Sequence, residues 1–190
     1  MQPAAHRSLS EAEYLAFEET ARVRHEYLAG EAYAMAGGSL RHNRIALNTA
    51  SLLLSRLSGR PCQVFLSDVK LHVAHDSAYY YPDVMATCAS QAVAADHSSI
   101  VTEPVLVVEI LSPATEIIDR REKLAAYRRL PSLQEYALVA QDRQQLEIYR
   151  RQRGSDWLYI ASGPGETVEF ESLGVTVPLA DLYVGTDIEA

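Results

Sequence analysis

Two acidic residues stand in parts of the sequence that are otherwise apolar. Asp83 follows Pro82 at the start of the run VMATC, and Glu109 interrupts the run VLVVEIL. An ionised carboxylate buried in such a run destabilises the fold unless it meets a cation, a set of hydrogen-bond donors or a metal. Asp83 and Glu109 are therefore candidate site residues.

Strand geometry indicates what chemistry the two acids could support. Residues two apart on a strand share a face, so Glu109 lies on the same face as Val107 and Leu111. Asp83 can approach Glu109 if its own strand pairs nearby. Two converging carboxylates beside a strand carbonyl suit Mg²⁺ or Mn²⁺, and Mg²⁺ typically takes one or two protein carboxylates together with water and substrate phosphate. Such a metal polarises a phosphodiester and lowers the pKa of an attacking water. The alternative is a structural Glu109 in a buried salt bridge.

The apolar pattern around these acids predicts the elements that must position them. VLVVEIL is apolar at nearly every position, which is typical of a strand buried on both faces and central in its sheet. Ser112 and Pro113 end this strand, and a helix of roughly 115 to 130 follows before Pro131. Helices packed on a mixed sheet give an α/β or α+β architecture.

Other segments give local signals of their own. Ser10 and Glu13 form a capping-box pattern that opens a short helix. The segment 25–35 is predicted to be a β-hairpin, and apolar residues at helical spacing predict a long helix over 40–57. The small, polar segment 89–103 is predicted to be a loop with a possible helical turn. Near the C-terminus, the runs EYALVA, LEIYRR, WLYIA and TVEFE predict a β-meander.

Length and composition predict one compact domain over residues 1–190. The chain is 48% hydrophobic and 22% charged, which is enough apolar material for a sizeable core. No run approaches the roughly 20 apolar residues of a membrane span, and the start lacks a signal-peptide pattern, so we expect a cytoplasmic protein. Cys62 and Cys88 have no metal-ligand spacing and are predicted to be reduced core thiols.

The charges are unevenly distributed along the chain. The formal net charge of −8, taken alone, argues against a nucleic-acid-binding protein, because duplex binding depends on neutralising phosphates. Nine of the 17 Lys and Arg residues, however, fall between positions 120 and 153. This basic region could bind nucleic acid, or it could be a solvated helix face and turn. The candidates for nucleic-acid binding are Arg120, Arg128, Arg129, Arg150 and Arg151.

Several motifs together resemble one family. YPDV at 81–84 is followed by VVEILSPAT at 107–115, then by Asp119, Lys123, Tyr127 and the strand EYALV, while AGEAYAMAGGSLRHN precedes them. This combination, spanning roughly 9–182, resembles the Uma-two endonuclease family, which is similar to the PD-(D/E)XK restriction-endonuclease-like superfamily. The resemblance implies a restriction-endonuclease-like mixed sheet flanked by helices, with an N-terminal hairpin and a C-terminal meander.

The resemblance also assigns roles to individual residues. Asp83 stands at the superfamily's Asp and Glu109 at its D/E, which implies that both are catalytic and bind the metal. The superfamily lysine would stand at position 111, but this chain has Leu111 there. Lys123 on the following helix is the natural substitute, because a long ammonium side chain can reach a site from a neighbouring helix. Its alternative is an i,i+4 pair with Asp119 worth only a few tenths of a kcal/mol.

Weaker candidates complete the set. Glu31 in the hairpin and His42 at the start of the long helix match family positions and are possible accessory residues, although each could equally be an ordinary surface acid or helix-start histidine. Lys70 is the second candidate for the missing lysine.

The resemblance implies a Mg²⁺-dependent endonuclease that acts on DNA, and we also expect a homodimer with no membrane partner. Two alternatives remain open. One is a nucleic-acid-binding domain that is catalytically silent because Leu111 replaces the lysine. The other is a structural or regulatory dimer without a nucleic-acid role, which the net acidity favours.

Overall fold

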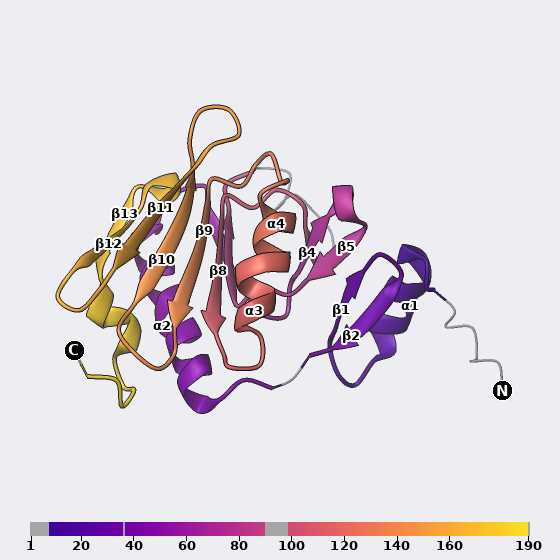
Figure 1. The fold of residues 1–190 in the computed structure, drawn as a ribbon, viewed down its shortest axis with the longest axis horizontal. Coiled ribbons are helices and arrows are strands. Elements are labelled where there is room, and N and C mark those ends of the chain that lie inside the picture. The colour runs from indigo at the N-terminus through magenta and orange to yellow at the C-terminus, as the bar shows by residue number, and fades with distance from the viewer. Residues whose placement is uncertain (1–7, 36, 90–98, 190) are drawn as a thin grey trace.

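A computed structural model describes residues 8–35, 37–89 and 99–189 of the protein. Its largest sheet is mixed and has six strands (Figure 1). In spatial order they are β11 (Trp157–Ser162), β10 (Leu146–Arg151), β9 (Glu135–Ala140), β8 (Leu106–Leu111), β6 (Val84–Thr87) and β3 (Gln63–Leu66). The predicted α/β (α+β) class is confirmed.

β8 is an interior strand of this sheet, as its apolar sequence predicts. All six of its residues are buried. It runs parallel to β9 and antiparallel to β6, so the sheet changes direction at β8. A strand that is covered on both faces and paired on both edges has no side chains in contact with solvent, so nearly all of its residues are apolar. Glu109 is the only charged residue of β8.

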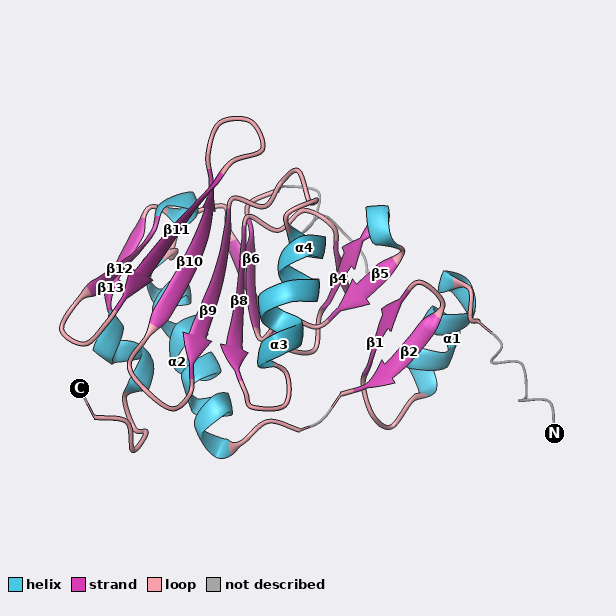
Figure 2. Cartoon of the chain, in the orientation of Figure 1, coloured by secondary structure: helices cyan, strands magenta, loops and turns pink. Residues whose placement is uncertain are grey.

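One face of the sheet is covered by the long helix α2 (Leu40–Arg56) (Figure 2). Buried residues of α2 form a core with Val108 and Ile110 of β8. Ser39 caps the helix by accepting a hydrogen bond from the backbone N–H of His42 at 3.0 Å. Neither α2 nor any other helix in the described ranges is long and apolar enough to cross a membrane.

The opposite face is covered by a helical segment with three parts (Figure 2). It packs a second core against Val107 and Leu111. A regular helix was expected here, but its middle is a π-helical turn, and the hydroxyl of Tyr136 donates a hydrogen bond to the Asp119 carbonyl there. π-turns occur frequently at functional sites. The parts are α3 (Glu116–Ile118), η2 (Asp119–Lys123) and α4 (Leu124–Tyr127).

A second sheet lies beside the first and carries the N-terminal hairpin (Figure 1). α1 (Glu11–Thr20) packs on it through a cluster of Tyr14, Tyr27 and Tyr79. The predicted capping box and hairpin are both confirmed. Most of the predicted loop at 89–103 lies outside the described residues. The strands, in spatial order, are β2 (Glu31–Ala34), β1 (His25–Leu28), β5 (Ala78–Tyr80), β4 (Lys70–Val73) and β7 (Ile100–Val101).

The predicted C-terminal meander is confirmed for β9, β10 and β11, which pair antiparallel in chain order. The last predicted strand departs from it, because β12 (Thr167–Phe170) pairs with β13 (Val175–Pro178) in a separate two-stranded sheet. Phe170 of β12 is buried in the same core as the buried residues of α2. Short 3-10 helices are η1 (Ala74–Asp76), η3 (Glu171–Leu173) and η4 (Leu179–Tyr183).

The prediction of two reduced thiols is wrong, because Cys62 and Cys88 form a disulfide. Gln63 of β3 pairs with Thr87 of β6, so the two cysteines stand opposite each other just beyond the paired residues. Their Cα atoms are 4.0 Å apart. The sequence alone could not show this proximity, because it depends on which strands are neighbours.

Candidate active site

The pairing of β6 with β8 brings Asp83 beside Glu109. Val84 pairs with Val108, so the residues that follow outward from this pair are Asp83 and Glu109. The backbone N–H of Asp83 donates to Oε2 of Glu109 at 3.3 Å, and the N–H of Ile110 donates to Oδ2 of Asp83 at 2.7 Å. The structure thus brings together the two acids that the sequence analysis singled out.

Lys123 reaches the same centre from the helical segment. Its Nζ lies 2.9 Å from Oε1 of Glu26, 3.1 Å from Oε1 of Glu109 and 3.4 Å from Oδ1 of Asp119. Only 6% of Lys123 is exposed. The pair with Asp119 is therefore not an exposed helix-surface pair but one contact in a buried network, and Lys123 brings its positive charge to Glu109.

The two other residues considered for the lysine role lie outside this network. Leu111 is buried in the core beneath the helical segment. Lys70 is also buried, but its Nζ donates to Oγ of Ser99 at 3.4 Å and lies over the ring of Tyr81. Of the two lysine candidates, the structure places Lys123 at the acids.

Glu26, rather than Glu31, is the acid that the hairpin contributes to the centre. Glu31 is exposed and accepts a hydrogen bond from the Tyr33 hydroxyl at 2.6 Å, so the structure does not bring this predicted accessory residue to the site. Glu26 is not among the residues predicted from the sequence. The available signal was strand alternation, because Glu26 shares a face with Leu28, which packs against the core.

His42, the other predicted accessory residue, does lie at the centre. Its Nε2 is 3.2 Å from Oδ2 of Asp83. Burial lowers the pKa of His42, but the hydrogen bond and charge of Asp83 outweigh burial and raise it. Gly38 makes room for the ring, because a side chain there would place its Cβ 2.9 Å from the His42 Nδ1.

A cavity of about 730 Å³ opens onto these residues. It lies between the segment 21–24 that precedes β1 and the loop that follows β8. Its walls combine acids of the centre with hydroxyl and guanidinium groups near the surface. Polar residues lining it include Arg22, Arg24, Ser39, His42, Asp83, Glu109, Ser112, Thr115, Asp119 and Lys123.

Burial and mutual repulsion shape the electrostatics of the centre. Burial raises the pKa of Glu109 well above its usual value; the charges of Asp83 and Asp119 add to this rise, and that of Lys123 opposes it. Burial likewise raises the pKa of Asp119. For Lys123, burial acts to lower the pKa, but the charges of Glu109, Glu26 and Asp119 outweigh it and raise the pKa well above its usual value. Lys123 therefore stays protonated.

The donor set suits a divalent ion that keeps much of its water. Both contacts of Asp83 use Oδ2, which leaves Oδ1 for a further ligand. Glu109 is oriented by the hydroxyl of Tyr127, which donates to its Oε1 at 3.0 Å. Among the described residues, no group of three or more His, Cys, Asp or Glu side chains is arranged to hold a metal. An ion would thus rely on Asp83 and Glu109, with water and phosphate completing its shell as Mg²⁺ prefers.

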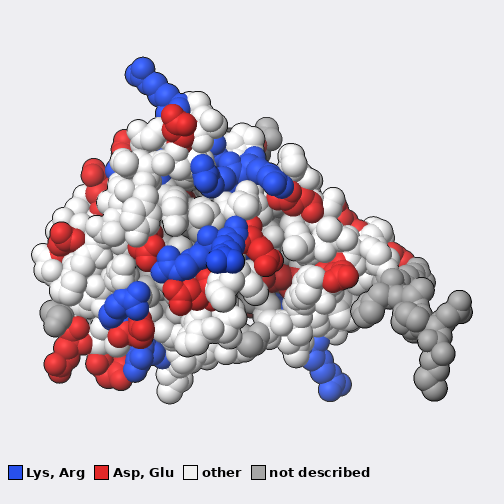
Figure 3. Space-filling view, in the orientation of Figure 1, with Lys and Arg blue, Asp and Glu red and all other residues white. Residues whose placement is uncertain are grey.

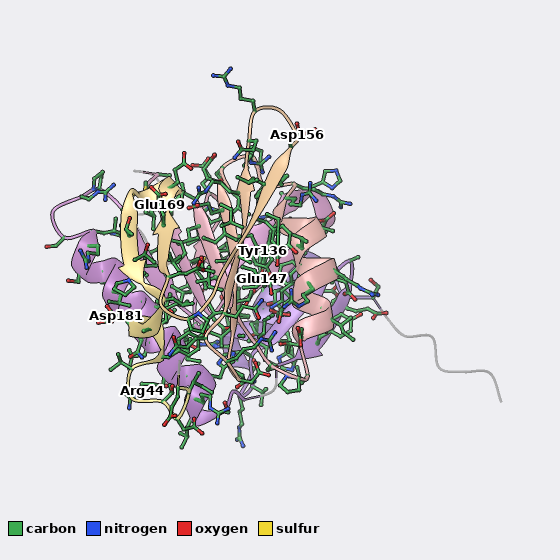
Figure 4. All side chains as sticks on the ribbon, turned by 60° about the vertical axis from the view of Figure 1, so that its left-hand side comes forward. Arg44, Tyr136, Glu147, Asp156, Glu169 and Asp181 are labelled. Carbon is green, nitrogen blue, oxygen red and sulfur yellow. A yellow bond between two sulfur atoms is a disulfide. The ribbon has the colours of Figure 1, made fainter. Side chains whose placement is uncertain are left out.

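Most of the predicted nucleic-acid-binding arginines are engaged inside the protein. Arg120 forms a bidentate pair with Glu147 at 2.7 and 2.8 Å, and Figure 4 shows Glu147 in the middle of the sheet beside the helical segment. Arg150 contacts Glu135 at 2.8 Å. Arg151 donates hydrogen bonds to three backbone carbonyls. These three arginines stabilise the fold.

The remaining two arginines of that set are more exposed but also partnered. Arg128 lies over the Trp157 ring at 5.5 Å, and Arg129 pairs with Asp76. Figure 3 shows basic and acidic side chains interleaved on this face rather than a continuous basic surface. A cluster of basic residues in the sequence is therefore a set of local pairs in space.

Comparisons with known proteins identify the family of the chain and its fold. The family model Uma2, described as "Putative restriction endonuclease", matches residues 11–180. The chain belongs to this family. The match covers both strands that carry the acids, the helical segment and the hairpin, so Glu26, Asp83, Glu109 and Lys123 all lie within the Uma2 region.

Relatives of this Uma2 protein match along most of its length. The uncharacterized proteins slr1290 and sll1609 of Synechocystis sp. are each 36% identical to it, over 93% and 86% of this chain respectively and 92% of each relative. A crystal structure from Anabaena variabilis, described as "a putative nuclease belonging to DUF820", has a TM-score of 0.75 at 18% identity. The match covers 92% of this chain and 97% of the other, which shows a shared fold.

Proposed function

We propose that this Uma2 protein is a Mg²⁺-dependent endonuclease that hydrolyses phosphodiester bonds of DNA, with Asp83 and Glu109 as metal ligands. The main support is the excess of carboxylates over cations in the immediate surroundings of Lys123. Lys123 contacts Glu26, Glu109 and Asp119, and Asp83 lies beside Glu109. One ammonium cannot balance four carboxylates, so a bound cation would stabilise their ionised forms.

Different residues of the centre would have different roles in this reaction. When bound, a divalent ion polarises a phosphodiester and lowers the pKa of an attacking water. Lys123 stays protonated, so its charge can offset negative charge on the phosphate oxygens. Tyr127 fixes the rotation of Glu109 through its hydrogen bond. His42 contacts Oδ2 of Asp83 through its Nε2 and so helps to orient that carboxylate.

A cleavage assay tests this proposal. The protein should hydrolyse DNA in Mg²⁺, and both EDTA and the isosteric change Asp83→Asn should abolish the activity. Glu31→Gln is the matched control, because it removes an acid of the same chain that is exposed and outside the cavity. Cleavage that survives Asp83→Asn would contradict the assignment. Salt-dependent DNA binding without cleavage would support the silent nucleic-acid-binding domain instead.

A further inference from the structure

Two exposed arginines line the cavity that contains the carboxylate centre. Arg22 and Arg24 belong to the short segment between α1 and β1, and both are exposed. The third cation of the lining is Lys123, which is buried among three carboxylates. Lys123 can act on a reacting phosphate, but it is too buried and too fully paired to bind other phosphates of a polymeric substrate. The two exposed arginines at the mouth of the cavity can bind them.

Neither arginine is strongly committed to another partner. Arg24 pairs with Asp68 at 3.7 Å, and the two side chains are 46% and 85% exposed. Such surface pairs contribute about 0 to 1 kcal/mol, so a ligand can replace this one. Arg22 forms no ion pair within the part of the chain that the structure describes. By contrast, Arg120 is already bound on two edges of its guanidinium by Glu116 and Glu147.

We propose that Arg22 and Arg24 bind phosphate groups of the polynucleotide that adjoin the bond to be cleaved. This inference rests on the proposed function and adds where the substrate strand lies. Guanidinium groups match phosphate geometry with paired N–H donors. The Arg24 guanidinium also lies over the Tyr81 ring, 5.9 Å from its centroid, and such a cation–π contact does not consume the N–H donors that a phosphate would use.

The position of Arg22 and Arg24 at the entrance offsets the negative charge of the cavity. Its lining includes Asp68 at the mouth and the buried carboxylates within, which repel a polyanion. Cations at the entrance offset that repulsion and attract the substrate along the same path. Arg24 is only two residues from Glu26, which contacts Lys123, so one segment supplies both the entrance and a wall of the centre.

Binding measured against salt concentration tests the inference. The double variant Arg22→Gln/Arg24→Gln is compared with Arg128→Gln/Arg129→Gln, which removes the same charge away from the cavity. A labelled DNA oligonucleotide is titrated in EDTA and followed by fluorescence anisotropy. Loss of two phosphate contacts should reduce the slope of log affinity against log salt by about 1.4 for single strands and about 1.8 for duplex. The control should keep the wild-type slope.

A small diester separates this inference from the proposed function. Bis(p-nitrophenyl) phosphate has no adjoining phosphates, so the Arg22→Gln/Arg24→Gln variant should hydrolyse it at the wild-type rate while losing at least about tenfold in kcat/KM on DNA. Three results would overturn the inference. The first is the same salt slope in both double variants, and the second is a flatter slope only in the Arg128→Gln/Arg129→Gln protein. The third is that the wild-type protein does not bind DNA. If wild type hydrolyses neither substrate, the proposed function fails, and the binding titration still decides the role of the arginines.

Discussion

The carboxylate centre around Glu109 and the arginine-rich region between positions 120 and 153 satisfy their charges in opposite ways. In the arginine-rich region, most guanidinium groups have an acid or carbonyl partner of their own, such as Glu147 for Arg120. At the centre, one ammonium serves several buried carboxylates. Charges that are paired one to one stabilise a fold, whereas an excess of negative charge in a cavity favours the binding of a cation. Under the proposed function, the acids carry the chemistry, whereas the paired arginines stabilise the fold.

Replacing Lys123 should have the largest effect of any single change. Lys123→Met leaves buried carboxylates without their cation, which should lower the free energy of unfolding by about 3 to 5 kcal/mol. It should also reduce the cleavage rate about 100- to 1000-fold, because an electrostatic group near the reacting oxygens is lost. Urea denaturation and initial rates measure the two effects. Lys70→Met is the control, and loss of cleavage there with activity retained in Lys123→Met would reverse the assignment.

Two acids of the same hairpin sharpen the comparison. Glu26→Gln removes the closest carboxylate partner of Lys123, whereas Glu31→Gln changes an exposed residue. Outer residues that orient a reactive centre typically contribute about 10- to 100-fold to activity, so Glu26→Gln should lower kcat by that range with little change in KM. Glu31→Gln should match wild type. Steady-state kinetics that show equal rates for the two variants would remove Glu26 from the site.

In the arginine-rich region, the change with the smallest expected effect should act on stability alone. The hydrogen bond and charge of Arg120 lower the pKa of Glu147, so this pair stabilises the fold above the ordinary glutamate pKa, and the contribution disappears as Glu147 becomes protonated at lower pH. Arg120→Gln should therefore lower the free energy of unfolding by about 1 kcal/mol at pH 7, and by less below about pH 4. Unfolding curves at both pH values measure this. If the loss of unfolding free energy in Arg120→Gln were larger at the lower pH, it would contradict the stabilising role of the pair.

The sequence could predict what depends on local pattern. Glu109 was recognisable because an acid in a fully apolar strand needs a partner, and the capping box at Ser10 is a short-range signal. Partners that depend on tertiary placement could not be derived. The disulfide of Cys62 and Cys88 depends on which strands are neighbours, and the contacts of Lys123 with Glu26 and Glu109 depend on how two sheets and the helical segment meet.

Charge was the least predictable property, for a related reason. The basic residues between positions 120 and 153 form a cluster in sequence, but Arg120, Arg129 and Arg150 each pair with an acid from a different strand or turn. Glu26 is separated from Lys123 by 97 positions, yet the two are in contact (123 − 26 = 97). A count of charged residues along the sequence therefore overestimates the size of a charged binding surface. It also does not reveal buried networks of ion pairs.

Calorimetric titration with Mn²⁺ tests most directly whether Asp83 and Glu109 form one divalent-ion site. Wild type should bind the ion, and both Asp83→Ala and Glu109→Ala should lose that binding while circular dichroism shows that each variant is folded. Glu31→Gln should bind as wild type does, because its side chain lies outside the cavity. Unchanged Mn²⁺ affinity in both alanine variants would contradict the account.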